Sequence, residues 1–468
     1  MSRLANAGEA LAMHARLTPD KIGASDLDRR MSFRLWHQRA CRLANALTGL
    51  GLGKGDRVAV LAYNAIEWLE IYAATALAGL VAVPVNFRLT GAEARYIIDN
   101  CEARALIVQD ELLGTIEAIR ADLAIASANI VVFGKAPGPA GFADYEDLLA
   151  RASDRPPSVA VDGADPWMLM YTSGTTGKPK GAIRNHRGGA MLSLVTEIEL
   201  GLSRHDSALL VMPMCHANSL YFYGAFSFCG GACAVYNRKS IDPEHLVRTL
   251  AEGGASFTSL VPTHYSMMLD LSAATRAKYN VDAVTKLMTS SAPARRETKL
   301  AIMEYFRNSG LFELYGSTEA GWVTMLHPDE QFDKLGSVGR ECVGSRPIRL
   351  LDADGNEVPD GEPGELFIAG ASIAQRSLGL RQCRQCGIEV AAQVLQACCI
   401  QSHRMYRATL QRLRLQRREA AVERGEVEPQ RVLAQHAELD QATFVRAAGR
   451  FRHSCRLLEA FACFTRIA

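Results

Sequence analysis

The chain has 468 residues, enough for two or three domains with a large buried core. Hydrophobic residues make up 48% and charged residues 22%, which is typical of a globular protein, and the net charge of +2 argues against a dedicated nucleic-acid binder. No segment is long and apolar enough to predict a transmembrane helix. Twelve cysteines without a signal-peptide pattern predict reduced thiols and a cytoplasmic location.

Short apolar runs rich in β-branched residues alternate with amphipathic stretches from about residue 30 to residue 370. Residues 57–62 predict a buried strand, residues 65–78 the following helix, and Gly79 the end of that helix. Further strands are predicted at residues 80–85, 105–108 and 130–133. This alternation is typical of a parallel sheet with helices on both faces.

The pattern repeats after Asp165, with strands predicted at residues 168–171, 207–212, 232–236 and 256–260. We interpret these strands as a second sheet and residues 154–166 as a linker between two halves. Apolar runs on both sides of the turn-rich residues 353–361 predict an antiparallel hairpin. The expected fold class is therefore α/β, with two doubly wound, mostly parallel sheets and a small antiparallel β unit.

The strongest local signal is the sequence YTSGTTGKPKG at residues 171–181, directly after a predicted strand. Glycines let backbone N–H groups approach an anion, hydroxyls add donors, and Lys178 and Lys180 add positive charge, as a triphosphate requires. The segment is not a Walker A loop, because Pro179 follows the lysine. A flexible linker is the alternative, but linkers rarely place these residue types in this order after a strand. The candidate phosphate ligands are Thr172, Ser173, Gly174, Thr175, Thr176, Gly177 and Lys178.

This segment resembles the signature loop of the adenylate-forming (AMP-binding) superfamily, which includes acyl-CoA synthetases, luciferase-like enzymes and peptide-synthetase adenylation domains. The resemblance implies that a carboxylate attacks the α-phosphate of ATP, giving an acyl-adenylate and pyrophosphate, and that a thiol, usually that of CoA, displaces AMP. It implies ATP, Mg²⁺ and CoA as co-substrates or cofactors. The resemblance covers about residues 11–373.

The sequence YGSTEAG at residues 315–321 is the second motif of this resemblance. It implies that Tyr315 stacks on adenine, that the Thr318 hydroxyl reaches the α-phosphate, and that Glu319 binds Mg²⁺. The small-residue turn at residues 290–294 resembles the segment that lies against adenine. A loop without a ligand is the alternative for residues 315–321. The expected ATP-binding residues in these two segments are Ser291, Ala292, Pro293, Tyr315, Gly316, Ser317 and Thr318, and Thr318, Glu319 and Lys178 are the expected catalytic residues.

The sequence MPMCH at residues 212–216 resembles the motif whose histidine or aromatic residue borders the acyl pocket. Without this motif context, the preferred interpretation of His216 is a hydrogen-bonded histidine of the protein core. The alternative for the aromatic residues that follow it is simple helix packing. The expected acyl-pocket residues are His216, Asn218, Tyr221 and Tyr223. These aromatic side chains fit a fatty-acyl chain and an aromatic ring equally well.

Residues 374–468 differ in composition from residues 1–373, which we assign to the AMP-binding core. They hold 16 arginines, no lysine and six of the twelve cysteines. The resemblance implies a T-G-D segment, an arginine-containing hinge and a small domain with a catalytic lysine here, but the last lysine in the chain is Lys334. Our hypothesis is a reading-frame change near codon 374; the alternative is a divergent helical tail. Cys383 and Cys386 lack a matching second pair, so we expect no zinc site.

The sequence therefore predicts ATP-dependent activation of a carboxylic acid followed by thioester formation with CoA, impaired by the atypical tail. Two alternatives stay open, a non-catalytic nucleotide-binding remnant and an adenylation module that loads a carrier protein. The expected partners are the acid, ATP and CoA, and neither the acid nor the oligomeric state can be read from the residues.

Overall fold

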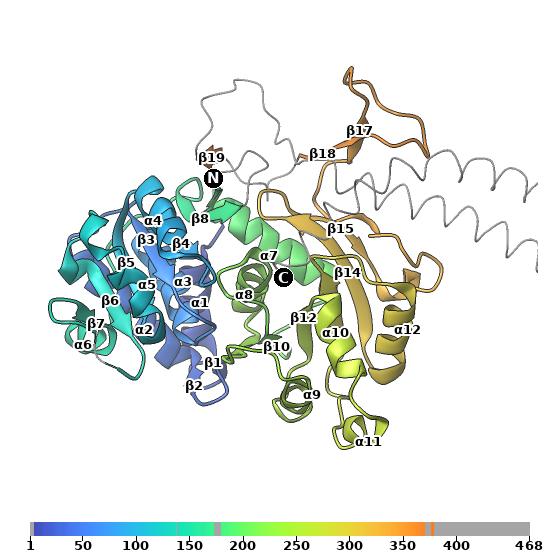
Figure 1. Ribbon diagram of the computed structural model, residues 1–468, viewed down its shortest axis with the longest axis horizontal. Coiled ribbons are helices and arrows are strands. Elements are labelled where there is room, and N and C mark those ends of the chain that lie inside the picture. Colours follow the sequence, from blue (N-terminus) through green and yellow to red (C-terminus); the bar gives the residue numbers. More distant parts are fainter. Residues whose placement is uncertain (1–3, 137, 173–178, 370–375, 379–468) are drawn as a thin grey trace, which may run out of the picture. The chain divides into compact units, whose positions relative to one another are not determined.

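The computed structural model describes residues 4–136, 138–172, 179–369 and 376–378, which all belong to the unit Met1–Ile400. Within these residues the chain forms two large mixed sheets, a two-stranded sheet and twelve α-helices (Figure 1). The helices are α1 (Ala7–Leu17), α2 (Phe33–Gly49), α3 (Glu67–Ala78), α4 (Gly91–Asn100), α5 (Leu113–Glu117), α6 (Tyr145–Arg151), α7 (His186–Leu200), α8 (Ala217–Cys229), α9 (Pro243–Glu252), α10 (Pro262–Leu269), α11 (Ala273–Arg276) and α12 (Arg296–Tyr305). The predicted fold class is confirmed.

The first sheet has the order β19-β9-β8-β4-β3-β5-β6-β7 in the described residues. Its pairings are parallel from β8 to β7 and antiparallel for β8–β9 and β9–β19. The strands are β3 (Arg57–Leu61), β4 (Val81–Val85), β5 (Ala103–Gln109), β6 (Ile130–Phe133), β7 (Ala143–Asp144), β8 (Pro166–Thr172), β9 (Lys180–Asn185) and β19 (Arg376–Leu378). Alternate residues enter two different cores, since Val58 and Val60 pack with the α2–α3 side and Ala59 and Leu61 with the α4–α5 side.

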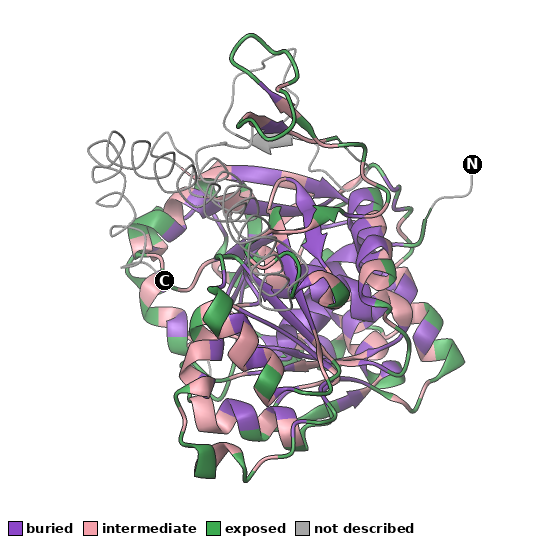
Figure 2. Cartoon of the chain, turned by 90° about the vertical axis from the view of Figure 1, so that its right-hand side faces the viewer, coloured by how far each residue is buried: buried purple, intermediate pink, exposed green. Residues whose placement is uncertain are grey.

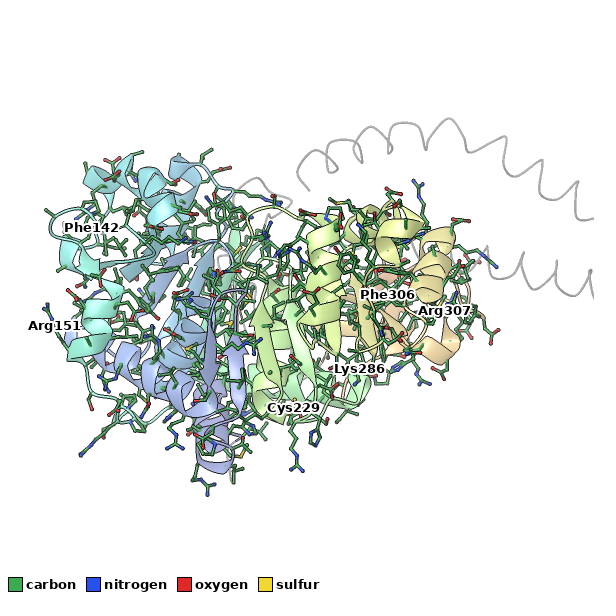
Figure 3. The ribbon with its side chains drawn as sticks, turned by 90° about the horizontal axis from the view of Figure 1, so that it is seen from below. Phe142, Arg151, Cys229, Lys286, Phe306 and Arg307 are labelled. Carbon is green, nitrogen blue, oxygen red and sulfur yellow. The ribbon has the colours of Figure 1, made fainter. Side chains whose placement is uncertain are left out.

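The second sheet has the order β16-β15-β14-β13-β12-β10-β11-β1-β2 in the described residues. Its six central strands, β14 to β1, run parallel, and antiparallel strands close both edges. The strands are β1 (Ile22–Ser25), β2 (Arg30–Ser32), β10 (Ser207–Leu210), β11 (Ala232–Val235), β12 (Phe257–Leu260), β13 (Lys286–Ser290), β14 (Gly310–Ser317), β15 (Gly321–Leu326) and β16 (Arg340–Glu341). At the amino end of β13, Lys286 (Figure 3) donates to Asp206 at 2.7 Å, an ion pair that ties β13 to the loop before β10.

The predicted division of strands between the two sheets is wrong at one point. The strand predicted at residues 168–171 is β8, which pairs with β4 of the first sheet through Ala82 and Met168. Residues 154–166 therefore do not separate two sequential halves. The N-terminal strand β1, which is not among the strands predicted from the sequence, pairs with β11 of the second sheet. Periodicity predicts that a segment is a strand, but its partner depends on contacts between residues far apart in the sequence.

Helices α7 and α8 lie between the two large sheets (Figure 1). A single hydrophobic core joins residues of both sheets to α2, α3, α7 and α8, and Figure 2 shows buried residues concentrated in strands and central helices. Every residue of α3 is buried, which agrees with its mostly apolar sequence, and its two glutamates pair with Arg29 and Arg39. As predicted, Gly79 ends α3, in a left-handed conformation with a φ of 64° that glycine adopts without strain.

The predicted hairpin is confirmed as the antiparallel pair β17 (Arg349–Leu351) and β18 (Glu365–Phe367). Strand β19 lies just beyond the predicted boundary at residue 373 and pairs with β9. The remaining residues of the predicted tail, including Cys383 and Cys386, lie outside the described residues. Among the described residues, no helix combines the length and apolar character needed to cross a membrane.

Candidate functional site

The candidate residues of the second sheet follow the ends of its central strands. His216 and Asn218 follow β10, Ser291 follows β13, and Tyr315 lies near the end of β14. Strands β10, β12, β13 and β14 are parallel neighbours. Their carboxyl ends therefore meet at one edge, which is where open α/β sheets usually bind ligands.

The turn after β13 presents its backbone to solvent. Ser291 has a φ of 67°, a left-handed conformation that is uncommon for a residue other than glycine, and Ser291, Ala292 and Pro293 are all exposed. Beneath the turn, the amide nitrogen of Asn218 donates to the hydroxyls of Ser259 and Ser290 at 2.9 Å each. Strained backbone that surrounding contacts hold in place is common at binding sites, so the geometry fits the predicted adenine contact.

The motif at residues 315–321 crosses from β14 to β15 through an irregular pairing at Tyr315 and Gly316. A side chain at Gly316 would bring its Cβ within 2.3 Å of the Gly321 carbonyl oxygen, so this position requires glycine. The Ser317 hydroxyl accepts a hydrogen bond from the Ala320 amide at 3.0 Å and shapes the loop. Thr318 and Glu319 are half-buried. Such irregularities often orient side chains beside active sites.

The two predicted motifs meet at one hydrogen bond. The Thr172 hydroxyl, at the end of β8, donates to Oε1 of Glu319 at 2.8 Å. Strands β8 and β9 form an antiparallel hairpin, so residues 173–179 connect two paired strands rather than a strand and a helix. The predicted phosphate ligands Ser173, Gly174, Thr175, Thr176, Gly177 and Lys178 lie outside the described residues.

The Thr318 carbonyl accepts two hydrogen bonds from side chains. Arg184 Nη2 donates to it at 3.0 Å and the Tyr221 hydroxyl at 2.8 Å. Arg184, which is 1% exposed, also donates from Nε to the Tyr221 hydroxyl at 3.2 Å. Sequence reasoning missed Arg184, because a single arginine in a strand outside the quoted motif residues carries no signal until its partners are known.

Two histidines beside the β10 and β12 ends have lowered pKa values. For His216, surrounding protein atoms desolvate the imidazolium even though the residue is exposed to solvent, and Arg88 adds a like charge. Burial and the same arginine lower the pKa of His264. Both histidines are therefore neutral near pH 7, where a neutral imidazole both donates and accepts hydrogen bonds.

Tyr221 and Tyr223 occupy different surroundings on α8. The Tyr221 ring packs edge-on against Trp322 at 5.2 Å between ring centroids, and its hydroxyl reaches the Thr318 carbonyl. Tyr223 is fully buried among Trp36 and Tyr72, with ring centroids at 6.1 and 5.5 Å. Tyr223 thus has the helix-packing role that the sequence left open, and its assignment to an acyl pocket stays a prediction.

The Glu319 carboxylate is suited to a metal ion that takes most of its ligands from a bound substrate. Among the described residues, no three His, Cys, Asp or Glu side chains are grouped to hold a metal ion. Mg²⁺ is usually bound by one or two carboxylates together with phosphate oxygens and water. The single Glu319 carboxylate fits that pattern.

Comparisons with known proteins identify one family. A family model described as AMP-binding enzyme matches residues 11–377. An indoleacetate–CoA ligase of Aromatoleum aromaticum is 31% identical over 78% of this chain and 70% of its own length. A long-chain-fatty-acid–CoA ligase of Thermus thermophilus is 32% identical over 72% of this chain and 63% of its own length. The solved structure of the anthranilate CoA ligase AuaEII with anthranoyl-AMP has a TM-score of 0.75 at 24% identity, covering 81% of this chain and 72% of that chain.

Proposed function

Because the chain belongs to the AMP-binding enzyme family, we propose that it activates a carboxylic acid with ATP and transfers the acyl group to CoA. The observation that carries this proposal is the 2.8 Å hydrogen bond from Thr172 to Glu319. It joins the hairpin of the candidate phosphate loop to the motif that holds Thr318. Thr172 and Glu319, which lie 147 residues apart in the sequence, thus supply one site with a hydroxyl and a carboxylate suited to a nucleotide.

The reaction has two steps. A carboxylate oxygen of the acid attacks the α-phosphorus of ATP and forms an O–P bond, and pyrophosphate leaves with the electron pair of the broken bond between the α-phosphorus and the oxygen that bridges it to the β-phosphorus. The CoA sulfur, after losing its proton, then attacks the acyl carbon, a C–S bond forms, and AMP leaves as the C–O bond breaks. Both steps depend mainly on positioning and on stabilising developing negative charge.

Each residue of the proposed site has a role that matches its chemistry. The Thr318 hydroxyl donates to an α-phosphate oxygen, Tyr315 offers its ring to adenine, and the backbone of residues 291–293 faces the base. Glu319 holds Mg²⁺, which neutralises phosphate charge when bound. Lys178 and the other loop residues bind the β- and γ-phosphates. Thr172 holds the Glu319 carboxylate in place from the first sheet.

The acid is proposed to lie beside α8, between His216 and Asn218. A neutral His216 keeps an N–H that can donate a hydrogen bond to the reacting carboxylate. The relatives named above are ligases for an indole acid and for a long-chain fatty acid, so an aromatic or a fatty acid both fit. Their names specify CoA as the acceptor, which favours CoA over a carrier protein.

Residues 374–468 affect the expected rate. The catalytic lysine that the family resemblance implies in this region would stabilise the transition state of adenylation. If that lysine acts as an oxyanion-hole donor does, its absence lowers the adenylation rate by about 10²–10³-fold. Acyl transfer to CoA depends on the same region in this proposal and is reduced further.

The first test is calorimetric titration of ATP with Mg²⁺ into the 468-residue chain. Glu319→Gln keeps an acceptor for Thr172 but removes the charge, and Lys178→Ala removes a loop cation. We expect the wild-type chain to bind and both variants to bind more weakly. Binding that neither variant weakens would contradict the assigned site, and a wild-type chain that binds no ATP would contradict the proposed function.

Turnover is tested by exchange of labelled pyrophosphate into ATP with fatty and aromatic acids. Exchange supports adenylation, and acyl-CoA formation identifies the acceptor. Exchange without acyl-CoA would limit the chain to the first step.

A further inference from the structure

Arg184 is a buried cation at the junction of the two candidate motifs. It lies in β9, three residues after Gly181, and is 1% exposed. Burying a guanidinium carries a large desolvation penalty, and the group keeps its charge in proteins, so it persists only where good hydrogen bonds and neighbouring groups offset that penalty. The partners of Arg184 therefore indicate what its charge is used for.

Several contacts of Arg184 converge on the peptide that precedes Glu319. Its Nη2 donates to the Thr318 carbonyl at 3.0 Å, its Nε donates to the Tyr221 hydroxyl at 3.2 Å, and its guanidinium carbon lies 4.8 Å from the Tyr221 ring centroid. The Tyr221 hydroxyl donates to the same carbonyl at 2.8 Å. Because the peptide unit is planar, fixing this carbonyl fixes the direction in which the chain enters Glu319.

A second contact holds the other end of Glu319. Its carboxylate accepts from Thr172, and Thr172 and Arg184 lie on the two paired strands of one hairpin. The hairpin therefore holds the backbone of Thr318 through Arg184 and the side chain of Glu319 through Thr172. A shift of the β8–β9 hairpin would therefore move both Thr318 and Glu319, which the proposed function assigns to the α-phosphate and Mg²⁺.

We propose that Arg184 is a positioning residue for ATP·Mg²⁺ binding, acting through the Thr318 carbonyl with Tyr221 as its supporting donor. The proposal rests on the proposed function. Arg184 holds Thr318 and Glu319 in the orientation that receives ATP and Mg²⁺, and its fixed positive charge lies beside an anion site in a region of low dielectric. Lysine does not replace it fully, because an ammonium lacks the planar fork that reaches two acceptors.

The experiment measures the dissociation constant of ATP by calorimetry at several Mg²⁺ concentrations, with the full 468-residue chain. The variants are Arg184→Gln, Arg184→Lys and Tyr221→Phe. Arg187→Gln, at an exposed arginine on α7, is the matched control for loss of one nearby positive charge. Melting temperatures are recorded for every sample, so that a loss of fold is separated from a loss of site geometry.

For Arg184→Gln we expect an ATP dissociation constant raised about 10–100-fold, the range of one hydrogen bond to a charged group, and a weaker dependence on Mg²⁺. Arg184→Lys should recover part of the affinity, Tyr221→Phe should raise the dissociation constant by less than tenfold, and Arg187→Gln should leave it unchanged. Tyr221→Phe keeps the ring, so it tests the proposal even if Arg184→Gln does not fold.

Two results would overturn the inference, and they are distinguishable. If the wild-type chain binds ATP and folded Arg184 variants keep its affinity and Mg²⁺ dependence, Arg184 is only structural. If the wild-type chain binds no ATP at any Mg²⁺ concentration, the proposed function fails and this inference fails with it.

Discussion

The two large sheets contribute to the candidate site in different ways. The second sheet supplies residues at and just beyond the carboxyl ends of its parallel strands, including Ser291, Tyr315 and Glu319. The first sheet supplies side chains from one antiparallel hairpin, with Thr172 and Arg184 both reaching the loop at residues 318–319. Loops at parallel strand ends present several groups to a ligand, whereas a paired hairpin fixes the position of a few.

A buried carboxylate with a cationic partner lies beside each of the two large sheets, and the two pairs differ in how far the cation is exposed. Beneath the candidate adenine turn, Glu313 pairs with Lys299, which is fully buried, and accepts from the Ala294 amide. On the helices beside the first sheet, Glu70 is held by Arg39 and by the Tyr145 hydroxyl at 2.7 Å. Burial raises the pKa of both carboxyls, and their partners oppose that shift. The Lys299 side chain is fully buried, whereas that of Arg39 is 21% exposed, so solvent reaches only the cation of the second pair.

The largest effect on stability is expected from Lys299→Met. This change leaves the Glu313 carboxylate buried without its cation, and we expect a loss of about 3–5 kcal/mol in the free energy of unfolding. The loss should be smaller at pH 5 than at pH 8, because a neutral carboxyl is easier to bury. Urea unfolding at both pH values measures it. Lys299→Met with Glu313→Leu should recover most of the stability, and a double variant as unstable as the single one would contradict this account.

A smaller loss is expected from Arg39→Met beside the first sheet. The Arg39 side chain is 21% exposed, and the Tyr145 hydroxyl still donates to Glu70 after the change. We therefore expect a loss of about 1.5–3 kcal/mol, the range for hydrogen bonds to charged groups. Urea unfolding under the same conditions gives the comparison. A loss equal to that of Lys299→Met would show that the two carboxylates do not differ as proposed.

The junction between the sheets is tested by Asn64→Ala. The Asn64 amide nitrogen lies 3.2–3.3 Å from the carbonyls of Val211, Met212 and Tyr236, and its oxygen accepts from the Met214 amide at 2.8 Å. Removing it leaves these groups without this partner, with an expected loss of about 1–3 kcal/mol. The matched variant Asn64→Asp keeps a side-chain oxygen that accepts from the Met214 amide, but it places a negative charge beside the three backbone carbonyls. Full thermal stability in both variants would exclude a role for Asn64 at this junction.

The smallest effect is expected from Glu197→Gln on α7. Burial raises the pKa of Glu197 from 4.5 to about 7, so the folded chain binds a proton more tightly than the unfolded chain. Stability from this group is present below pH 4.5 and is lost as pH rises toward 7. Partial exposure limits the effect to about 1 kcal/mol. The change in unfolding free energy between pH 5 and pH 8 should shrink in the variant, and an unchanged pH dependence would contradict the assignment.

Most of the fold is predictable because its signals are local. The strand at residues 57–61 and the end of α3 at Gly79 follow from apolar runs and from the freedom of glycine to adopt a positive φ. The strand at residues 166–172 was identified but assigned to the wrong sheet, since both sheets offer apolar strands of similar length. The sequence of a buried strand does not specify its neighbour.

The sequence by itself determined the residue types of a nucleotide site, through the YTSGTTGKPKG and YGSTEAG motifs, and the family to which they belong. Only the tertiary structure decided that Thr172 contacts Glu319 and that Arg184 and Tyr221 share the Thr318 carbonyl. The physical reason is the range of the forces involved. Local propensity and periodicity act over a few residues, whereas a buried cation finds its partners only after two distant segments have packed together.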